Sequence, residues 1–359
     1  MPQGLPRLNA RGHETHVSTA RKAGLTYVTD SEQGITRKRA GGGFAYYHPD
    51  GSLIRDPAER KRIGALVIPP AWNDVWICPD PGGHLQATAR DAKGRKQYRY
   101  HPRFRARRDQ SKFGRMLTFS AALPHLREQV EIDLKPPRLS RRKLLATLVR
   151  LLDRTLIRVG NDEYTRANRS YGLTTLRQRH VAVEGHTVRF EFKGKSGVRH
   201  SVTITDRRLA AIVQQLQDLP GQQLFKFIDE DGKRQSIDSD DVNAYLREVT
   251  GLDVTAKDFR TWSGTMLAAR ALREMGPGAS EREVRRNVNR ALDHVASRLR
   301  NTRAVCRKYY VHPAILDAYQ RGVTVPAPPP DGQRSRPGAA LRRDEITVLQ
   351  FLQREIAKR

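Results

Sequence analysis

The spacing of apolar residues changes character near residue 100, and this change constrains the fold most. Over residues 25–100 the apolar runs are short, as at residues 75–77, and Gly, Pro, Asn and Asp separate them. Short runs bounded by turn residues are typical of strands. Over residues 142–158 leucines recur at spacings of three and four, which indicates an amphipathic helix with Gly160 as its cap. The sequence therefore predicts two domains of different class.

One segment inside the helical part returns to the two-residue period of a strand. Residues 188–192 alternate between apolar and polar side chains, and residues 198–205 alternate again. The glycines of residues 193–197 separate them, so this pattern predicts a β-hairpin with Lys195 at its tip. The expected fold class is α+β, with a small β-rich N-terminal domain and a larger, mostly α-helical domain that carries the hairpin.

These patterns predict four parts along the chain. Residues 1–20 are polar and unpatterned, and we expect them to form a mobile arm. The β-rich domain is expected over residues 21–104 and the helical domain over residues 105–322. Residues 323–359 contain a Pro-rich linker followed by a last amphipathic helix.

The charge of the chain indicates a polyanionic partner. There are 66 Lys and Arg against 38 Asp and Glu, a formal net charge of +28. Such an excess attracts polyanions at long range, and nucleic acid is the commonest of them. Cations are dense over residues 99–115, a stretch expected to connect the domains and to face phosphates. The alternatives are a solvated helix face and a protein whose surface is merely basic.

Several other classes of protein lack support in the sequence. No apolar run approaches the roughly 20 residues of a membrane span, and the N-terminus has no apolar signal segment. Cys78 and Cys306 are expected to be reduced thiols of a cytosolic protein. We find no metal-ligand spacing and no nucleotide-binding glycine motif, because the glycines at residues 41–43 lack a following Lys. We therefore expect no metal and no cofactor.

Four positions hold cations or hydrogen-bonding groups in unusual places, and each has an ordinary explanation when taken alone. Arg158 at the end of a helix favours the helix dipole. Lys195 at a hairpin tip is solvated, and Arg260 stacks on the nearby Trp262. Asn301 precedes a segment that ends in a pair of tyrosines.

Taken together and in this order, these positions match a family. The chain resembles type IB DNA topoisomerases, in particular the compact poxvirus-like and bacterial branch, from about Trp72 to Tyr310. Each matching piece is short, and their order along the chain makes the resemblance specific. The pieces are Gly94-Arg95-Lys96-Gln97-Tyr98-Arg99-Tyr100, Ile157-Arg158-Val159-Gly160, Lys193-Gly194-Lys195, Lys257-Asp258-Phe259-Arg260-Thr261 and Asn301-Thr302.

The resemblance implies a catalytic site and an activity. Tyr310 is the implied nucleophile, with Arg158 and Arg260 as catalytic arginines. Lys195 is the implied general acid, and Asn301 stands where poxvirus and eukaryotic members have His and bacterial relatives have Asn. The implied fold is the catalytic fold shared with tyrosine recombinases. The implied activity is relaxation of supercoiled duplex DNA by transient single-strand cleavage through a 3′-phosphotyrosyl intermediate, without ATP or metal.

These side chains suit that chemistry. Arginine offers planar, always-charged donors that bind phosphate oxygens in pairs, so Arg158 and Arg260 suit a phosphate clamp. The leaving 5′-oxygen needs a proton, which Lys195 can donate. Asn301 can donate a neutral hydrogen bond but cannot shuttle protons. A tyrosine can form the covalent ester.

The segment around the nucleophile leaves two questions open. Tyr309 adjoins Tyr310, and we choose Tyr310 because it lies nine residues after Asn301, which is the interval in the family. The family commonly has Gly before this Asn and Thr-Pro after it, whereas Arg300 and Arg303 stand at the Gly and Pro positions here. These arginines either alter the local turn or add phosphate contacts.

The resemblance also implies contacts with DNA outside the catalytic set. Gln97, Tyr98 and Tyr100 match a segment of the N-terminal domain that contacts DNA in poxvirus-type members. The alternative for this segment is a strand with a half-buried pair of tyrosines. Tyr164 and Lys257 match further contact positions, and Lys257 is expected to assist proton transfer.

Two rival functions fit part of this pattern. A tyrosine recombinase uses the same chemistry, but recombinases usually have His at the position of Lys257 and a helical N-terminal domain. An architectural DNA-binding protein needs only the basic surface.

The expected protein is a monomer clamped around duplex DNA in the cytoplasm, associated with the nucleoid, with no membrane or nucleotide as a partner. Its affinity is expected to fall steeply with salt.

Overall fold

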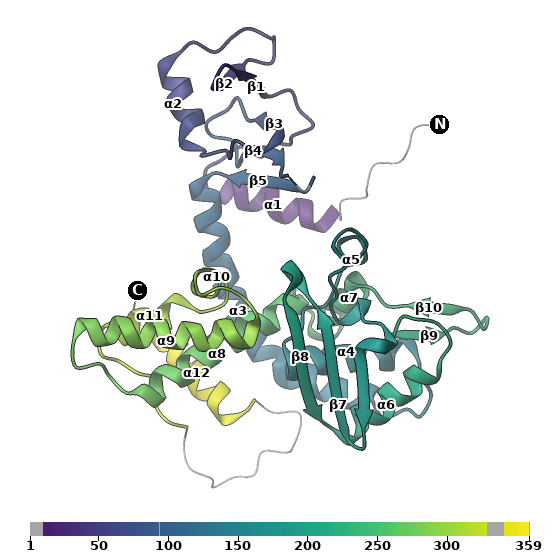
Figure 1. The fold of residues 1–359 in the computed structure, drawn as a ribbon. Helices are drawn as coiled ribbons and strands as arrows, with labels where there is room; N and C mark the ends of the chain where they lie inside the picture. The colour runs from purple at the N-terminus through teal and green to yellow at the C-terminus, as the bar shows by residue number, and fades with distance from the viewer. Residues whose placement is uncertain (1–9, 93, 329–340, 359) are drawn as a thin grey trace. The chain divides into compact units, whose positions relative to one another are not determined.

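The computed structural model describes residues 10–92, 94–328 and 341–358 (Figure 1). The chain forms two compact units, Met1–Gly114 and Arg115–Arg359, each of which is described by itself below. The sequence analysis expected a division at residue 104, ten residues before the observed one. The difference arises because the division falls within one long helix, α3 (Pro102–Asp133).

The N-terminal unit is built around a five-stranded antiparallel sheet in the order β2-β1-β3-β4-β5. Its core is formed by Ile35, Ile77 and Ala87 of the sheet with Ile63 of helix α2. These side chains are almost completely buried, which accounts for the short apolar runs of the sequence. The elements are β1 (Ile35–Ala40), β2 (Gly43–Tyr47), α2 (Pro57–Ala65), β3 (Asn73–Ile77), β4 (Leu85–Arg90) and β5 (Lys96–Tyr100).

A helix lies where the sequence analysis expected an arm. Helix α1 covers Ala10–Lys22, whereas residues 1–9 are outside the described part of the chain. Ala20 and Ala23 pack against Leu25 and Phe104 in a small apolar cluster. Helix α1 has few apolar residues, so its sequence pattern is weak, and the helix depends on these tertiary contacts.

The basic stretch at the start of α3 is helical. Phe104 and Phe113 are buried, while Arg105 and Arg107 are exposed. The side chains of residues 109–112 lie outside the described part. The stretch is thus an amphipathic helix with a charged face.

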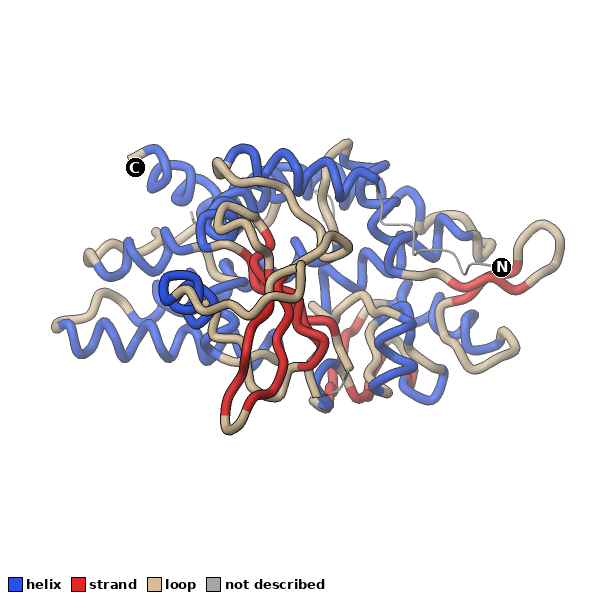
Figure 2. Tube along the Cα trace, turned by 90° about the horizontal axis from the view of Figure 1, so that it is seen from above, coloured by secondary structure: helices blue, strands red, loops and turns tan. Residues whose placement is uncertain are grey.

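The C-terminal unit is mostly helical, as predicted. Figure 2 shows the strands of both units in red and the helices in blue. A three-stranded antiparallel sheet has the order β6-β7-β8, and its β7–β8 hairpin ends at the pair Lys193–Arg199. A second small hairpin, β9–β10, was not predicted. The helices are α4 (Arg141–Thr155), α5 (Asp162–Asn168), α6 (Arg207–Asp218), α7 (Ser239–Thr250), α8 (Ala256–Met275), α9 (Glu281–Leu299), α10 (Arg303–Tyr309), α11 (Pro313–Gln320) and α12 (Arg343–Ala357). The strands are β6 (Val181–Glu184), β7 (Thr187–Lys193), β8 (Arg199–Thr205), β9 (Lys226–Ile228) and β10 (Arg234–Ser236).

The end of α4 differs from the prediction. The helix is capped by Leu156, which adopts a left-handed conformation with φ 57°, so Gly160 is not the cap. Arg158 therefore lies in the loop that follows α4. Gly160 has a φ of 110° in this loop, and a Cβ added to Gly172 would lie 2.6 Å from the Gly160 nitrogen. The two glycines allow two loops to approach closely beside Arg158.

The last helix belongs to the core of the C-terminal unit. Helix α12 contacts α8 and α11, and its side chains Phe351 and Leu352 are buried. Glu345 at its start accepts two hydrogen bonds from Arg127, at 2.8 and 2.9 Å, and one from Trp262 at 3.3 Å. The linker that precedes α12 lies partly in residues 329–340, outside the described part of the chain.

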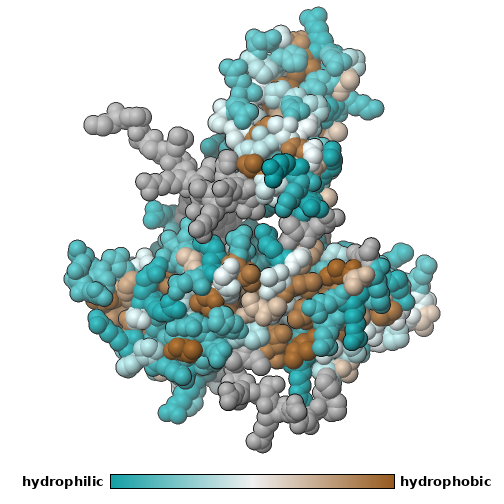
Figure 3. Space-filling model, turned by 180° about the vertical axis from the view of Figure 1, so that it is seen from behind, coloured by the Kyte–Doolittle hydropathy of each residue, from teal (hydrophilic) through white to brown (hydrophobic). Residues whose placement is uncertain are grey.

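One face of the protein is predominantly polar. Figure 3 shows hydrophilic side chains over most of one face, with apolar side chains in small groups. Within residues 10–92, 94–328 and 341–358 every helix is too short or too polar to cross a membrane.

Candidate active site

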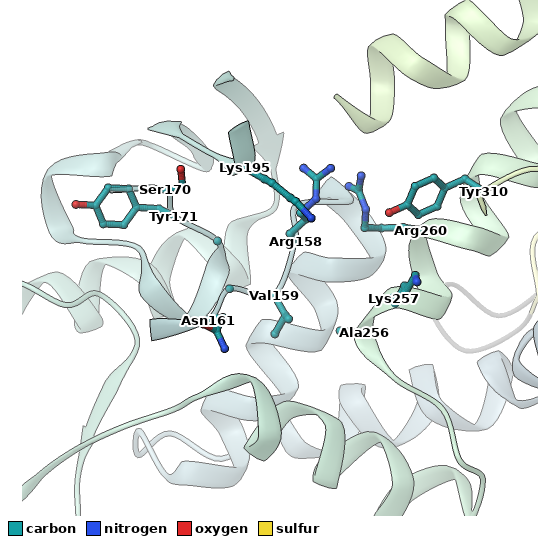
Figure 4. A pocket seen from close by; sticks show the side chains of 12 residues that line it. Arg158, Val159, Asn161, Ser170, Tyr171, Lys195, Ala256, Lys257, Arg260 and Tyr310 are labelled. Carbon is teal, nitrogen blue, oxygen red and sulfur yellow. The ribbon is translucent and has the colours of Figure 1, made fainter. Parts of the chain in front are cut away.

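Two adjoining cavities of the C-terminal unit collect the predicted catalytic residues. The first, of about 480 Å³, is lined by Arg158, Lys195, Arg260 and Tyr310 (Figure 4). The second, of about 720 Å³, shares Arg158, Lys195 and Tyr310 and adds Asn301. Segments that are far apart in the sequence thus converge on one place: the loop after α4, the tip of the β7–β8 hairpin, the start of α8 and the turn on each side of α10.

Arg260 is held by the carbonyl ends of two helices. Its side chain is only 3% exposed. The guanidinium donates to the carbonyl of Leu156, the cap of α4, and at 2.6 Å to the carbonyl of Leu299, the last residue of α9. Helix C-termini carry unsatisfied carbonyls and partial negative charge, so they suit a buried cation. Burial, and then the charge of Arg158, lowers the pKa of Arg260 to about 10.

Arg158 and Asn301 are joined by a hydrogen bond. Nη2 of Arg158 donates to Oδ1 of Asn301 at 2.8 Å, although the two residues are 143 positions apart. This bond fixes the orientation of the amide, since Oδ1 is the acceptor. Nδ2 of Asn301 is buried and finds no hydrogen-bond partner within the described part of the chain. A buried donor without a partner is costly, and a bound phosphate oxygen would satisfy it.

Tyr310 lies immediately after α10, with its hydroxyl directed at the arginines (Figure 4). The Arg260 guanidinium carbon is 5.3 Å from the centre of the Tyr310 ring. Burial of the phenol opposes its ionisation, but the charge and hydrogen bond of Arg260, followed by the charges of Arg158 and Lys257, outweigh it. The pKa of Tyr310 therefore lies below its ordinary value of 10.0. A lowered pKa makes the phenolate more accessible as a nucleophile.

The neighbouring tyrosine has a different environment. Tyr309 is 36% exposed, and Nζ of Lys308 lies 5.2 Å from the centre of its ring. Tyr309 lines the larger cavity, whereas the smaller cavity is lined by Tyr310 alone of the pair. The geometry favours Tyr310 as the residue that faces the arginines.

The two lysines approach the site from opposite sides. Lys195 is exposed at the hairpin tip, as predicted, and its side chain extends toward Arg158 (Figure 4). Lys257 is exposed in the first turn of α8, three residues before Arg260. Both line each of the two cavities.

The predicted DNA-contact residues of β5 have unequal environments. Gln97 donates to Asp91 at 2.9 Å, and Tyr98 is 48% exposed. Tyr100 is half-buried, and its ring stacks on Phe104 at 5.4 Å. Burial raises the pKa of Tyr100. Tyr98 is thus available at the surface of the N-terminal unit, while Tyr100 contributes to packing.

Tyr164 cannot be compared in the same way. It belongs to α5, and its side chain lies outside the described part of the structure.

The sequence analysis missed residues that shape the site without lining it. His200 in β8 is buried and stacks on Phe192 at 4.7 Å. Burial, and then the charges of the site arginines, lowers the pKa of His200 to about 4. Gly264 and Thr265 of α8 lie against the backbone of Tyr310, and the Thr265 hydroxyl donates to the Tyr310 carbonyl at 3.3 Å. A glycine inside a helix was the one available signal, because it often marks close packing.

The described residues contain no group of three or more His, Cys, Asp or Glu that could hold a metal ion. Cys78 and Cys306 are both buried free thiols. Burial raises the pKa of Cys306 to about 11, which keeps this thiol protonated beside the site.

Comparisons with known proteins identify the family of this chain. The family model of the eukaryotic DNA topoisomerase I catalytic core matches residues 101–325. The model of the bacterial DNA topoisomerase IB N-terminal domain matches residues 43–91. The chain is also 34% identical over 296 residues to DNA topoisomerase 1B of Acanthamoeba polyphaga mimivirus, which covers 80% of this chain and 88% of the viral protein. The chain belongs to the type IB DNA topoisomerases, which relax DNA through a phosphotyrosyl intermediate.

Proposed function

We propose that Tyr310 is the nucleophile of this topoisomerase and that Arg158, Arg260, Asn301 and Lys195 are its catalytic partners. The observation that carries this assignment is the direction of the Tyr310 hydroxyl, which faces Arg260 in a cavity also lined by Arg158 and Lys195. The lowered pKa of Tyr310 supports it independently of the family resemblance.

Cleavage then proceeds by one exchange of phosphate esters. The oxygen of Tyr310 attacks the scissile phosphorus and loses its proton to solvent. The bond between phosphorus and the 5′-oxygen breaks, and Lys195 gives its proton to the departing 5′-oxygen. The product is an ester between Tyr310 and the 3′-phosphate. Attack by the 5′-hydroxyl reverses each step, so the strand is resealed without ATP.

The cations and the amide stabilise the charge that develops on the phosphate. Arg260 is pre-positioned by its helix-terminal carbonyls and costs no reorganisation when charge develops on the non-bridging oxygens. Arg158 keeps donors besides the one bound to Asn301, and Nδ2 of Asn301 is unpartnered within the described residues. Lys257 contributes a further charge and assists the proton transfer. These side chains supply the charge stabilisation, so we propose that the reaction needs no metal ion.

The test is plasmid relaxation in EDTA and without ATP, followed by peptide mapping of the trapped phosphotyrosine. The wild-type protein is expected to relax supercoils of either sign, and the adduct is expected at Tyr310. Tyr310→Phe is expected to bind DNA but to form no adduct, whereas Tyr309→Phe is expected to retain cleavage. An adduct that persists in Tyr310→Phe and disappears in Tyr309→Phe would assign the nucleophile to the other tyrosine.

We also propose that the protein acts as a monomer clamped around duplex DNA, associated with the nucleoid in the cytoplasm. Residues 21–104 would contact DNA through Gln97 and Tyr98, with a contribution from Tyr100, and Tyr164 of α5 would add a contact from the C-terminal unit. The exposure of Tyr98 supports this role most directly. Tyr98→Ala is expected to weaken DNA binding without loss of stability, and light scattering of the protein bound to a short duplex would give the stoichiometry.

A further inference from the structure

We propose that Arg300 binds the DNA phosphate next to the scissile one and positions the strand for cleavage. The inference rests on the proposed function, since it takes the cavity of Tyr310 to be the cleavage site.

The backbone of Arg300 is in a conformation that favours glycine. Arg300 caps α9 with φ 50° and ψ 58°, in the left-handed region. Residues with a Cβ are disfavoured there, and helices that end in this way usually have Gly or Asn at this position. Leu156 and Ser196 also have a positive φ, and each adjoins the site as well. Strained residues of this kind persist where their surroundings or their function require them.

The side chain of Arg300 is not used to hold the fold. It is exposed, and within the described residues its guanidinium has no hydrogen bond or ion pair. Arg303, the other arginine of this turn, differs because its Nε and Nη2 bind Asp293 at 2.7 and 2.6 Å. Of the two, Arg300 is thus the one available to a ligand.

The surroundings of Arg300 select an anionic ligand. Arg300 lines the larger cavity together with Arg158, Lys195 and Lys257, and no Asp or Glu is among the described residues that line it. Four cations that share a cavity without a carboxylate repel one another, and phosphate groups relieve this repulsion. The guanidinium is suited to phosphate because its donors are fixed in a plane.

The position of Arg300 indicates which phosphate it binds. Asn301, the next residue, holds its unpartnered Nδ2 at the cavity where Tyr310 attacks. Adjacent Cα atoms are about 3.8 Å apart, and their side chains point in different directions. The longer arginine therefore reaches the neighbouring phosphate of the strand while Asn301 faces the scissile one.

The test is Arg300→Gly, a change that suits the left-handed backbone and is expected to preserve folding. If Arg300 only capped α9, the variant would be more stable and would cleave as before. We expect Tm to rise by about 2–4 °C as strain is relieved. We expect covalent adduct formation, measured in a single turnover at saturating DNA, to slow by about ten- to a hundredfold as a charged phosphate contact is lost.

A matched control removes the same charge from the same helix. Arg298 lies two residues earlier in α9 and lines a different cavity, so Arg298→Ala is expected to leave the rate of adduct formation unchanged. The DNA is a synthetic duplex that carries a mapped cleavage site, shortened so that the released strand diffuses away. Equal slowing of Arg298→Ala and Arg300→Gly would overturn the proposal.

Neutral phosphates identify the contact directly. In a series of duplexes, one phosphate at a time beside the cleavage site is replaced by a methylphosphonate. Replacement of the phosphate next to the scissile one is expected to slow adduct formation by the wild-type protein and to have no further effect on Arg300→Gly. An unchanged rate for Arg300→Gly, or equal sensitivity of both proteins at every position, overturns this inference while Tyr310 still forms its adduct. Failure of the wild-type protein to form an adduct at Tyr310 overturns the proposed function instead.

Discussion

Gly264 places the nucleophile, and replacing it with alanine is expected to slow cleavage. Gly264 lies in α8, one turn after Arg260, and packs against the backbone of Tyr310. A Cβ at this position would lie 2.6 Å from the Tyr310 carbonyl oxygen and 3.0 Å from its Cβ. The obstacle is mostly backbone, so a rotamer change cannot relieve the contact.

The size of the effect follows from this distance. Ordinary contact begins at 3.4 Å, so Tyr310 or α8 must retreat by about 0.8 Å. Misplacement of a reacting group by about 1 Å costs on the order of a hundredfold in rate. Alanine is a better helix former than glycine by about 1 kcal/mol, but overpacking costs about 1–3 kcal/mol. Stability is thus expected to change little while the rate of adduct formation falls on the order of a hundredfold.

The assay is single-turnover adduct formation at saturating DNA, with unfolding by urea measured in parallel. Gly64→Ala is the matched control, because Gly64 lies in α2 and an added Cβ there meets nothing within 4 Å. This control is expected to gain about 1 kcal/mol of stability and to cleave normally. If Gly264→Ala cleaved DNA at the wild-type rate, the close contact with Tyr310 would not position the nucleophile.

Two further predictions concern stability. Glu345→Ala removes one carboxylate partner of the buried Arg127 and also the acceptor of Trp262, so urea unfolding is expected to show a loss of about 3 kcal/mol. An unchanged midpoint would mean that α12 does not support α8. The pKa of His200 is about 4 in the folded protein against 6.5 as its ordinary value, so the unfolded state takes up a proton first as the pH falls. The neutral His200 contributes fully to the free energy of unfolding above about pH 6.5, and this contribution declines by about 3 kcal/mol as the pH falls to 4. The free energy of unfolding of His200→Gln is therefore expected to fall less steeply between pH 7 and 4 than that of the wild-type protein. The same pH dependence in both proteins would contradict a buried neutral His200.

Secondary structure was predictable where the periodic pattern was long. The leucine repeat of α4 and the alternation of β7 and β8 predicted these elements close to their observed bounds. The β9–β10 hairpin escaped prediction because strands of three residues are too short to establish a period. Helix α1 escaped because its few apolar contacts are made with residues outside the helix.

The helix cap shows why local rules were insufficient. Gly160 suited a cap by residue type, yet Leu156 adopts the left-handed conformation. The strain at Leu156 is offset by a tertiary contact, because its carbonyl accepts from Arg260, which is 104 positions away. No pattern within α4 contains this information.

The sequence by itself determined the candidate site residues, because the chemistry of phosphate transfer limits the residue types and the family fixes their order. Their roles remain predictions that the experiments above test. Only the tertiary structure decided which of these side chains are bound to other groups of the protein and which are available to a ligand. It placed Arg158 against Asn301, buried Arg260 between two helix ends, and bound Arg303 to Asp293 while leaving Arg300 at the cavity. Such distinctions depend on which distant segments meet, and a hydrogen bond across 143 residues is not encoded in local spacing. The tyrosine pair by itself does not show which of its members is the nucleophile. The direction in which Tyr310 faces the arginines now favours Tyr310.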